Sequence, residues 1–436
     1  MNVWKQIKTK LTYNKTAFLL VLIVLITLPL NYAFNSISII ILFLFSVFVL
    51  VFKKRNVYRK PNAISVLLIS VYMVALVTLF WSDNISRSLK SLSSFLSYLI
   101  LPISFYILNS STKEKLFNRK TKERIVRYFS FSLSCYAMYC MIIGGIHLFK
   151  TKEISQIFYH TLSSNLNMMN AVFLSVFVAF GFIYFLTKKN KTAIEVTCLI
   201  VLLLFLMLLS SKMIIIITAL LSLVYMIKNG YKKQYLLKTK HLAIVVCVGL
   251  IAVIASKNVR ERILNEFAKT NINEVLVKKD FDDEYLWTGA GLRVFQIKAF
   301  FEIVSEEKGS IKGLGLNNSQ EKLNNKYIEY NLYKGFQNYH FHNQYIQIFS
   351  ELGLLGLLLL LSIFYLVFKQ AVLNRDFLFF SFIFVITTIC MTDTFLWKQK
   401  GMVFFITIVL LFYEAPQKPQ EELLKNSIKK NDIVIC

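Results

Sequence analysis

The side chains best suited to chemistry lie between Tyr339 and Gly356, in the sequence YHFHNQYIQIFSELGLLG. His340, His342 and Asn343 stand where a long polar stretch gives way to an apolar one. Imidazole accepts or releases a proton near neutral pH without special tuning. Because most of the chain is apolar, this pattern predicts a proton-transfer site at a membrane surface.

The composition predicts the class of protein that must position these residues. Of the 436 residues, 56% are hydrophobic and 39 are Phe, with a mean hydropathy of +0.56, well above the values of a soluble domain. We therefore expect an all-α polytopic membrane protein. A bilayer-spanning helix needs roughly 20 apolar residues, and about twelve stretches approach this length. They are 17–35, 37–52, 63–81, 93–109, 126–148, 168–187, 193–210, 212–227, 242–256, 346–368, 377–395 and 401–413.

The positive charges predict the orientation of these helices. Lys and Arg gather near the N-terminus and at every second connection, in 53–60, 113–127, 188–191, 228–240 and 369–375. The positive-inside rule assigns these segments to the cytoplasm, so both termini should be cytoplasmic. The same asymmetry accounts for most of the net charge of +26, and we expect no nucleic-acid partner.

The spans and the long polar stretch divide the chain into four parts. Residues 1–256 should hold transmembrane helices one to nine, 257–345 an extracytoplasmic loop, 346–413 helices ten to twelve, and 414–436 a cytoplasmic tail. The loop lacks an inverted counterpart elsewhere in the chain, which argues against a transporter or flippase. Few charges fall within spans, chiefly Glu195 and Asp393 near helix ends, where we expect their side chains to reach the membrane surface.

The loop has a predicted helix of its own over residues 292–306. Leu292, Phe295, Ala299 and Ile303 recur at helical spacing, and we expect this apolar face to rest on the membrane surface. Arg293 would lie in the first turn, where the N-terminus of a helix favours anions.

The histidine segment resembles the signature of the O-antigen ligases and the related O-antigen polymerases. His342-Asn343, nine further residues and then Gly353-Leu354-Leu355-Gly356 match all four fixed positions of the pattern H-[NSQ]-x9-G-x-x-G, ahead of a late span. Weaker similarities extend over most of the chain. They are Trp81-Ser82-Asp83, Asn165 to Ala171, Ser210-Ser211-Lys212, Gly291-Leu292-Arg293 and Gly313-Leu314-Gly315.

This resemblance implies a GT-C-like membrane glycosyltransferase of the bacterial inner membrane that requires no metal or other cofactor. Its donor would be a glycan on undecaprenyl diphosphate. His342 is then the candidate base for the acceptor hydroxyl, and Arg293 and Lys212 would bind the leaving diphosphate. Lys212 departs from the Arg usual in the family, and a Lys binds phosphate as a point charge rather than as a fork.

Several alternatives remain open on the residues themselves. His340 competes with His342, because on a helix the two would point about 200° apart and only one would face a given cleft. We prefer His342, with Asn343, His340, Gly353 and Gly356 in supporting roles. The acidic run Asp280 to Glu284 offers a rival divalent-metal site, which acidic surface loops rarely provide.

Ligase and polymerase share a donor and differ in acceptor, which is lipid A-core for the first and a second lipid-linked glycan for the second. The His-Asn-Gly-Gly spacing and the single large loop favour the ligase. Leu357 argues for the polymerase, because a Thr often follows the second Gly in ligases.

Overall fold

The computed structural model describes residues 2–52, 60–110, 116–167, 169–230, 271–282, 285–307 and 311–413. All of its regular elements are helices. They are α1 (Asn2–Ile26), α2 (Tyr32–Phe52), α3 (Ala63–Val77), η1 (Thr78–Trp81), α4 (Ile85–Phe95), α5 (Ser97–Ser110), α6 (Arg119–Thr151), η2 (Ile154–Ile157), α7 (Tyr159–Asn167), α8 (Ala171–Thr187), α9 (Ala193–Leu208), α10 (Lys212–Gly230), α13 (Ile272–Val277), α14 (Gly289–Glu306), α15 (Ser319–Glu329), η3 (Lys334–Phe336), α16 (Gln344–Leu373), α17 (Phe377–Ile389), η4 (Phe395–Trp397) and α18 (Gln399–Phe412).

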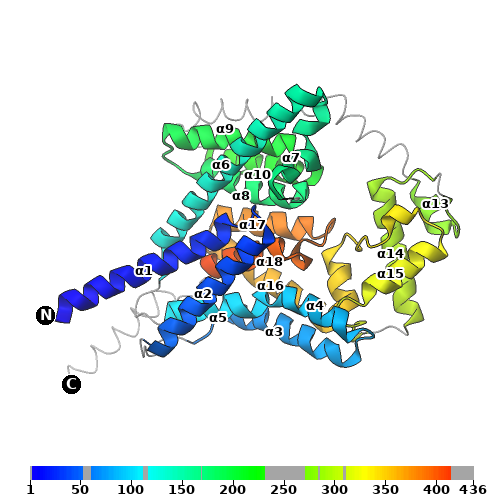
Figure 1. Cartoon of the computed structure of the whole chain (residues 1–436), viewed down its shortest axis with the longest axis horizontal. Coiled ribbons are helices and arrows are strands. Elements are labelled where there is room, and N and C mark those ends of the chain that lie inside the picture. Colours follow the sequence, from blue (N-terminus) through cyan, green and yellow to red (C-terminus); the bar gives the residue numbers. More distant parts are fainter. Residues whose placement is uncertain are drawn as a thin grey trace, which may run out of the picture.

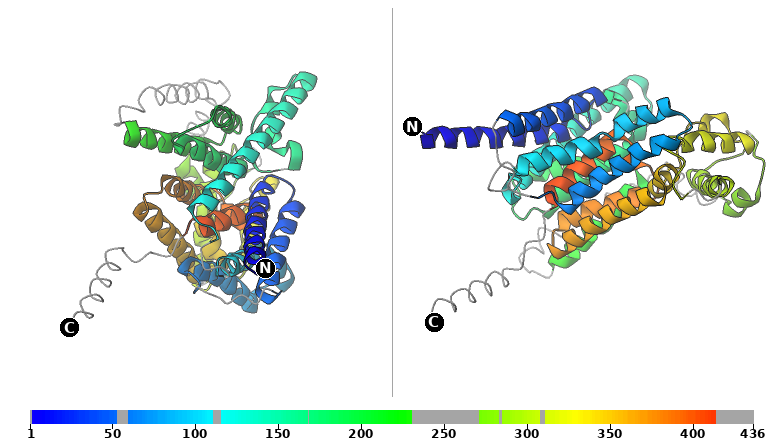
Figure 2. Two further views of the ribbon diagram at one scale, coloured as in Figure 1. Left: turned by 90° about the vertical axis from the view of Figure 1, so that its left-hand side faces the viewer. Right: turned by 90° about the horizontal axis from the view of Figure 1, so that it is seen from below.

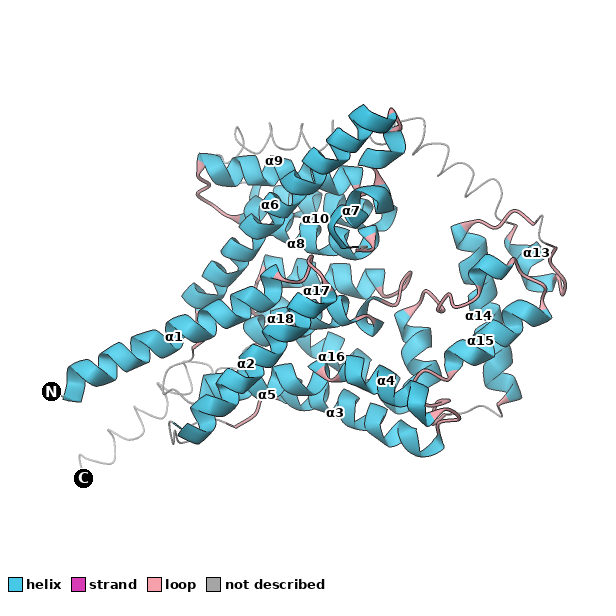
Figure 3. Cartoon of the chain, in the orientation of Figure 1, coloured by secondary structure: helices cyan, strands magenta, loops and turns pink. Residues whose placement is uncertain are grey.

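The helices form a bundle with a small helical domain at one end (Figures 1 and 3). We call the described part of residues 271–341, which contains α13, α14 and α15, the loop domain. It projects from the end of the bundle opposite to the N-terminal end of α1, as the side view also shows (Figure 2). This arrangement fits a membrane protein whose polar loop folds outside the bilayer.

Length and composition identify the helices able to cross a membrane. Five qualify among the described residues: Tyr32–Phe52, Ala63–Trp81, Ile85–Ser110, Arg119–Thr151 and Gln344–Leu373. The apolar stretches Tyr13–Ile26, Ala171–Thr187, Ala193–Leu208, Phe377–Ile389 and Gln399–Phe412 are helical but shorter. Every predicted stretch other than 242–256, which lies outside the described residues, overlaps one or more helices. The number of about twelve full spans stays a prediction.

Two predicted boundaries were wrong, each because a turn interrupts an apolar run. The stretch 17–35 is broken after Ile26 and resumes as α2 at Tyr32, with Pro29 in the turn between. The stretch 377–395 ends its helix at Ile389. Residues 390–394 then form turns, which removes Asp393 from the predicted span.

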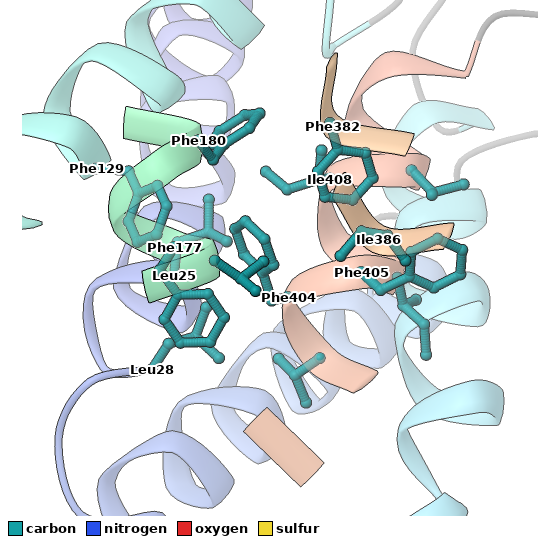
Figure 4. Close-up of a cluster of buried hydrophobic side chains, with 14 of the residues drawn as sticks. Leu25, Leu28, Phe129, Phe177, Phe180, Phe382, Ile386, Phe404, Phe405 and Ile408 are labelled. Carbon is teal, nitrogen blue, oxygen red and sulfur yellow. The ribbon is translucent and has the colours of Figure 1, made fainter. Parts of the chain in front are cut away.

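The centre of the bundle is packed with aromatic side chains from α6, α8, α17 and α18. Phe404 lies 4.6 Å from Phe177 and 6.0 Å from Phe129 between ring centroids, and Phe382 packs from the other side at 5.6 Å (Figure 4). Helix α8 is buried over Ala171–Leu186, whereas α2, α9, α10 and α16 expose large apolar side chains. These exposed apolar faces are suited to contact with lipid.

The loop domain has a hydrophobic core of its own. Leu292, Phe295, Ala299 and Ile303 of α14 are buried, against Leu323 and Tyr327 of α15 and further residues of the domain. The amphipathic helix predicted over 292–306 is therefore confirmed as α14. Its expected placement on the membrane surface was wrong, because the apolar face packs inside the protein instead.

The buried carboxylate of Glu195 also differs from expectation. Its side chain does not reach the membrane surface but is fully buried, with Lys188 Nζ at 2.5 Å and Arg127 Nε at 3.0 Å from Oε1. Glu195 also completes a capping box with Thr192 at the start of α9. A buried carboxylate needs such partners. Arg127 lies on another helix, so the sequence alone did not indicate that Glu195 could be buried.

The predicted membrane orientation can be tested by labelling. In a variant without the six native cysteines, we expect Ile328→Cys, on the exposed side of α15, to react with a membrane-impermeant maleimide in intact cells. Lys189→Cys, in the connection between α8 and α9, should react only after the cells are permeabilised. The opposite pattern would invert the orientation that the cation clusters predict.

Candidate functional site

His342 lies in the loop that leads into α16 and faces Asp393. Its Nδ1 atom is 4.0 Å from Asp393 Oδ1, and its side chain retains 29% of its exposure. The ring of Tyr339 meets the imidazole edge-on at 5.6 Å between centroids. His342 also has a backbone φ of +47°, an uncommon conformation for a residue with a side chain. Such local strain is typical of residues held for a function.

Hydrogen bonds at the start of α16 set the position of this loop. Asn343 is the N-cap, and its Oδ1 accepts from the backbone N–H groups of Tyr345 (3.0 Å) and Ile346 (3.1 Å). Its Nδ2 donates to the carbonyl of Met391 at 3.3 Å. Asn343 thus holds the helix start against the segment that carries Asp393, and it acts on His342 through the backbone.

Gln344 makes a second connection to the same segment. Its backbone N–H donates to the carbonyl of Cys390 at 2.8 Å, and its side-chain Oε1 accepts from the backbone N–H of Leu396 at 2.9 Å. These bonds fix the α17–α18 connection against the start of α16. The pairing of His342 with Asp393 follows from that contact.

Arg293 reaches the same place from the loop domain. The prediction that it lies in the first turn was wrong, because α14 begins at Gly289 rather than at Leu292, so Arg293 lies in the second turn. Its Nε donates to the carbonyl of Thr392 at 3.1 Å. Its Nη1 donates to the carbonyl of Gly289 at 2.9 Å. The guanidinium therefore joins the loop domain to the residue next to Asp393.

His340 belongs to the same cluster, which the sequence argument did not allow. The segment from Asn338 to Asn343 is not helical, so the expected divergence of the two imidazoles was wrong. Lys398 Nζ donates to His340 Nε2 at 2.7 Å. Burial and then the charge of Lys398 lower the pKa of His340 to about 3, so this imidazole stays neutral and accepts that hydrogen bond.

The environment of His342 also favours its neutral form. Burial lowers its pKa below the usual value, and the cations of Arg293 and Lys398 lower it further, while Asp393 opposes them. A neutral imidazole is the form able to accept a proton. Burial likewise lowers the pKa of Lys398.

The first of the two signature glycines, Gly353, forms a break in α16 where another loop enters. Gly353 has φ +68° and ψ −165°, outside the helical range. A Cβ there would lie 2.2 Å from the carbonyl oxygen of Ile311, and one at Gly313 would lie 2.4 Å from Gly353 N. Leu314 N–H donates to Ser350 O (2.8 Å), and Leu354 N–H donates to Ile311 O (2.8 Å). The glycines are therefore needed for close backbone packing.

Gly356 lies one turn further along α16 and is buried. A Cβ at this position would lie 2.4 Å from Leu352 Cβ. The geometry of the break thus also limits the residue at Gly356 to one without a side chain.

The Trp-Ser-Asp motif contacts this break. Trp81 Nε1 donates to Gly313 O at 3.2 Å, and Ser82 Oγ donates to Asn318 Oδ1 at 3.2 Å. Ser88 Oγ donates to Leu316 O at 2.6 Å. Motifs far apart in the sequence thus meet in one structural unit that anchors the loop domain to the bundle.

Lys212 is the first residue of α10. The other end of α10 is fixed by Tyr225, whose hydroxyl donates to Thr187 O at 3.0 Å and whose ring lies 5.2 Å from that of Phe377. Phe377 begins α17, and Asp393 follows the end of α17. Lys212 therefore lies at the same end of the bundle as Asp393, and its part in the site remains a prediction.

The described acidic residues of the run 280–284 lie on the surface of the loop domain. Asp280 and Asp282 are exposed, and residues 283 and 284 fall outside the described ranges. Within the described ranges, no three His, Cys, Asp or Glu side chains gather as a metal site would require.

A protein-family model matches the region that contains Arg293, His340 and His342. Residues 196–361 match the family model described as O-antigen ligase. This region is similar to the O-antigen ligase family, and we call it the O-antigen ligase domain. The O-antigen ligase domain runs from α9 to the middle of α16 and includes Lys212, Arg293, His340, His342 and Asn343. Members of the family are membrane enzymes that process lipid-linked glycans. No curated protein matches the chain.

Asp393 and Lys398 lie beyond the O-antigen ligase domain and were missed as site residues by the sequence analysis. Asp393 was assigned to the end of a span, and Lys398 received no role. The available signal was the run of polar residues Thr392, Asp393 and Thr394 within an apolar stretch, which is costly in a membrane unless it has partners.

Proposed function

We propose that the protein transfers a glycan from undecaprenyl diphosphate to a hydroxyl of lipid A-core at the outer face of the bacterial inner membrane. The observation that carries the proposal is the position of His342, beside Asp393 and within a domain of the O-antigen ligase family. A GT-C-like arrangement of the spans and cytoplasmic termini are parts of the same proposal.

In this mechanism His342 is the general base. Its Nδ1 points toward Asp393, so Nε2 takes the proton from the acceptor hydroxyl as the oxygen attacks the anomeric carbon. The bond between that carbon and the diphosphate oxygen breaks, and the electron pair leaves with undecaprenyl diphosphate. Asp393 stabilises the imidazolium that forms. This sequence conserves atoms and charge without a metal ion.

Cations stabilise the leaving diphosphate in the proposed reaction. Arg293 offers a guanidinium whose remaining N–H groups suit phosphate oxygens, and Lys212 adds a point charge. A diphosphate is already a good leaving group, so positive charge serves it better than a general acid.

The product formed by purified protein distinguishes the two candidate acceptors, lipid A-core and a second lipid-linked glycan. Purified protein given undecaprenyl-diphosphate-linked glycan and lipid A-core should form glycosylated lipid A-core in one step and release undecaprenyl diphosphate. A polymerase would instead extend the lipid-linked glycan into a ladder without lipid A-core. Leu357, where ligases often carry Thr, is the residue that supports this second candidate.

The pH dependence of transfer should follow the charges around His342. A base must be unprotonated, so kcat/KM should fall as the pH drops through the lowered pKa of His342. Lys398→Met removes a nearby cation and should move this acidic limb to higher pH. Asp393→Asn removes the opposing anion and should move it to lower pH. Shifts in the same direction would contradict the assignment of His342 as the base.

A further inference from the structure

A polar cleft of about 450 Å³ lies between α4 and α15. Every residue that lines it is polar or charged, including the amides Asn317, Gln320, Asn324 and Asn338. Small-molecule pockets of this size are usually lined by apolar and aromatic side chains. The cleft is therefore suited to a ligand that exposes many hydrogen-bonding groups.

Helix α4 divides its surface between membrane and cleft. One side carries the exposed apolar residues Ile85 and Leu89. Leu96, the residue after the end of α4, is also exposed on this side. Arg87, Lys90, Ser91 and Ser94 line the cleft from the roughly opposite side. A substrate with a lipid anchor and a polar head would meet both surfaces at this helix.

The charges at the cleft largely cancel each other. Arg87 Nη1 and Glu321 Oε2 form an ion pair at 2.9 Å that joins α4 to α15. Lys90 is the remaining charged residue in the lining. Amides and hydroxyls both donate and accept hydrogen bonds, which matches sugar hydroxyls better than a diphosphate.

One acceptor in the lining is unsatisfied. The Gln320 Oε1 atom is buried and has no hydrogen-bond partner among the described residues. Its Nε2 donates to the carbonyl of Tyr339 at 3.0 Å. A buried polar atom without a partner is costly, and a rotation of the Gln320 amide toward the cleft would let a ligand hydroxyl satisfy it.

The cleft adjoins the loop that carries His342, because Asn338 of the lining belongs to the same segment. Asn338 N–H donates to Asn324 Oδ1 at 2.9 Å, and Gln320 holds the next residue, Tyr339. The Tyr339 ring in turn contacts the imidazole of His342. A sugar chain that begins at His342 can thus pass along Tyr339 into the cleft.

We propose that the α4–α15 cleft binds the sugar chain of the substrate beyond the unit that reacts at His342. The proposal rests on the proposed function for the identity of the ligand. It assigns to the cleft the recognition of a glycan several sugars long. The cleft adds binding energy and contributes nothing to the proton transfer.

Tryptophan substitutions on α4 test this assignment. Ser91→Trp fills the cleft, and Ser94→Trp is a second variant at a more exposed lining position. Ser93→Trp, on a different side of the same helix, is the matched control because Ser93 does not line the cleft. The probe is the free oligosaccharide of several repeat units, released by mild acid from the lipid-linked glycan and titrated into full-length protein in detergent.

We expect the two cleft variants to bind the oligosaccharide about tenfold more weakly, the loss that one or two hydrogen bonds to the ligand would cause. Ser93→Trp should bind as the wild type does. Equal affinity of the wild type and both cleft variants would overturn the proposal.

Transfer assays separate this proposal from the proposed function. With the long glycan donor, Ser94→Trp should raise KM about tenfold and leave kcat nearly unchanged. With a donor that carries a single sugar it should behave as the wild type. If Ser94→Trp transfers both glycans with an unchanged KM, the cleft proposal is refuted and the transferase proposal stands. If the wild type binds the oligosaccharide and the cleft variants do not, but the wild type transfers no glycan, the transferase proposal is refuted and the cleft proposal stands.

Discussion

Replacing His342 with alanine is expected to lower the rate of glycan transfer by about 10²–10⁴-fold, the contribution of a well-placed general base. The variant removes the imidazole that faces Asp393 and leaves the N-cap of α16 intact, because that cap depends on Asn343. The rate would be measured with purified protein and a lipid-linked glycan donor. Added imidazole should restore part of the activity if the ring acts as the base.

The matched control for this experiment is His147→Ala. His147 is exposed on α6 and belongs to another region of the bundle. This variant should keep the wild-type rate, and both variants should unfold at nearly the wild-type temperature. Transfer by His342→Ala at close to the wild-type rate would move the base to another residue. His340 would then be the first to examine, although its hydrogen bond with Lys398 makes it a poor base.

Replacing Gly353 with alanine is expected to destabilise the protein by about 2 kcal/mol or more. A positive φ combined with an extended ψ is a conformation that essentially only glycine adopts, and it costs other residues on the order of 1–3 kcal/mol. Overpacking adds about 1–3 kcal/mol. The new Cβ would lie 2.2 Å from Ile311 O, in the loop that Trp81 also holds. The change should lower the thermal unfolding temperature in detergent and, by releasing this loop, the transfer rate.

Gly145→Ala is the control for the glycine substitution. Gly145 lies within α6, and a Cβ at this position would have no neighbouring atom within 4 Å. Alanine is the better helix former, so this variant should be as stable as the wild type or slightly more stable. A Gly353→Ala protein with an unchanged unfolding temperature would mean that the loop and α16 separate easily.

Helix positions were largely predictable from the sequence, because they depend on local composition and spacing. Apolar length predicted nearly every bundle helix, and periodicity predicted α14, although the helix begins at Gly289 rather than at Leu292 and places Arg293 in its second turn. Errors occurred at Ile26 and Ile389, where turns interrupt apolar runs that look continuous by composition.

The motif residues were also found from the sequence, but several of their roles were not. Gly353 was noted as part of a signature, and its close contact with Gly313 depends on a loop forty residues earlier in the chain. Trp81 and Ser82 were likewise noted, and their hydrogen bonds to Gly313 and Asn318 join segments more than 200 residues apart. Such contacts have no local signal.

The sequence by itself determined that this chain is a membrane protein with a histidine-bearing loop before a late helix. Only the tertiary structure decided that His342 faces Asp393, that Lys398 engages His340, and that the apolar face of α14 is buried in a separate core. The physical reason is that hydrophobic length and helical period act over a few turns of chain. Ion pairs and core packing instead depend on which distant segments the folded bundle brings together.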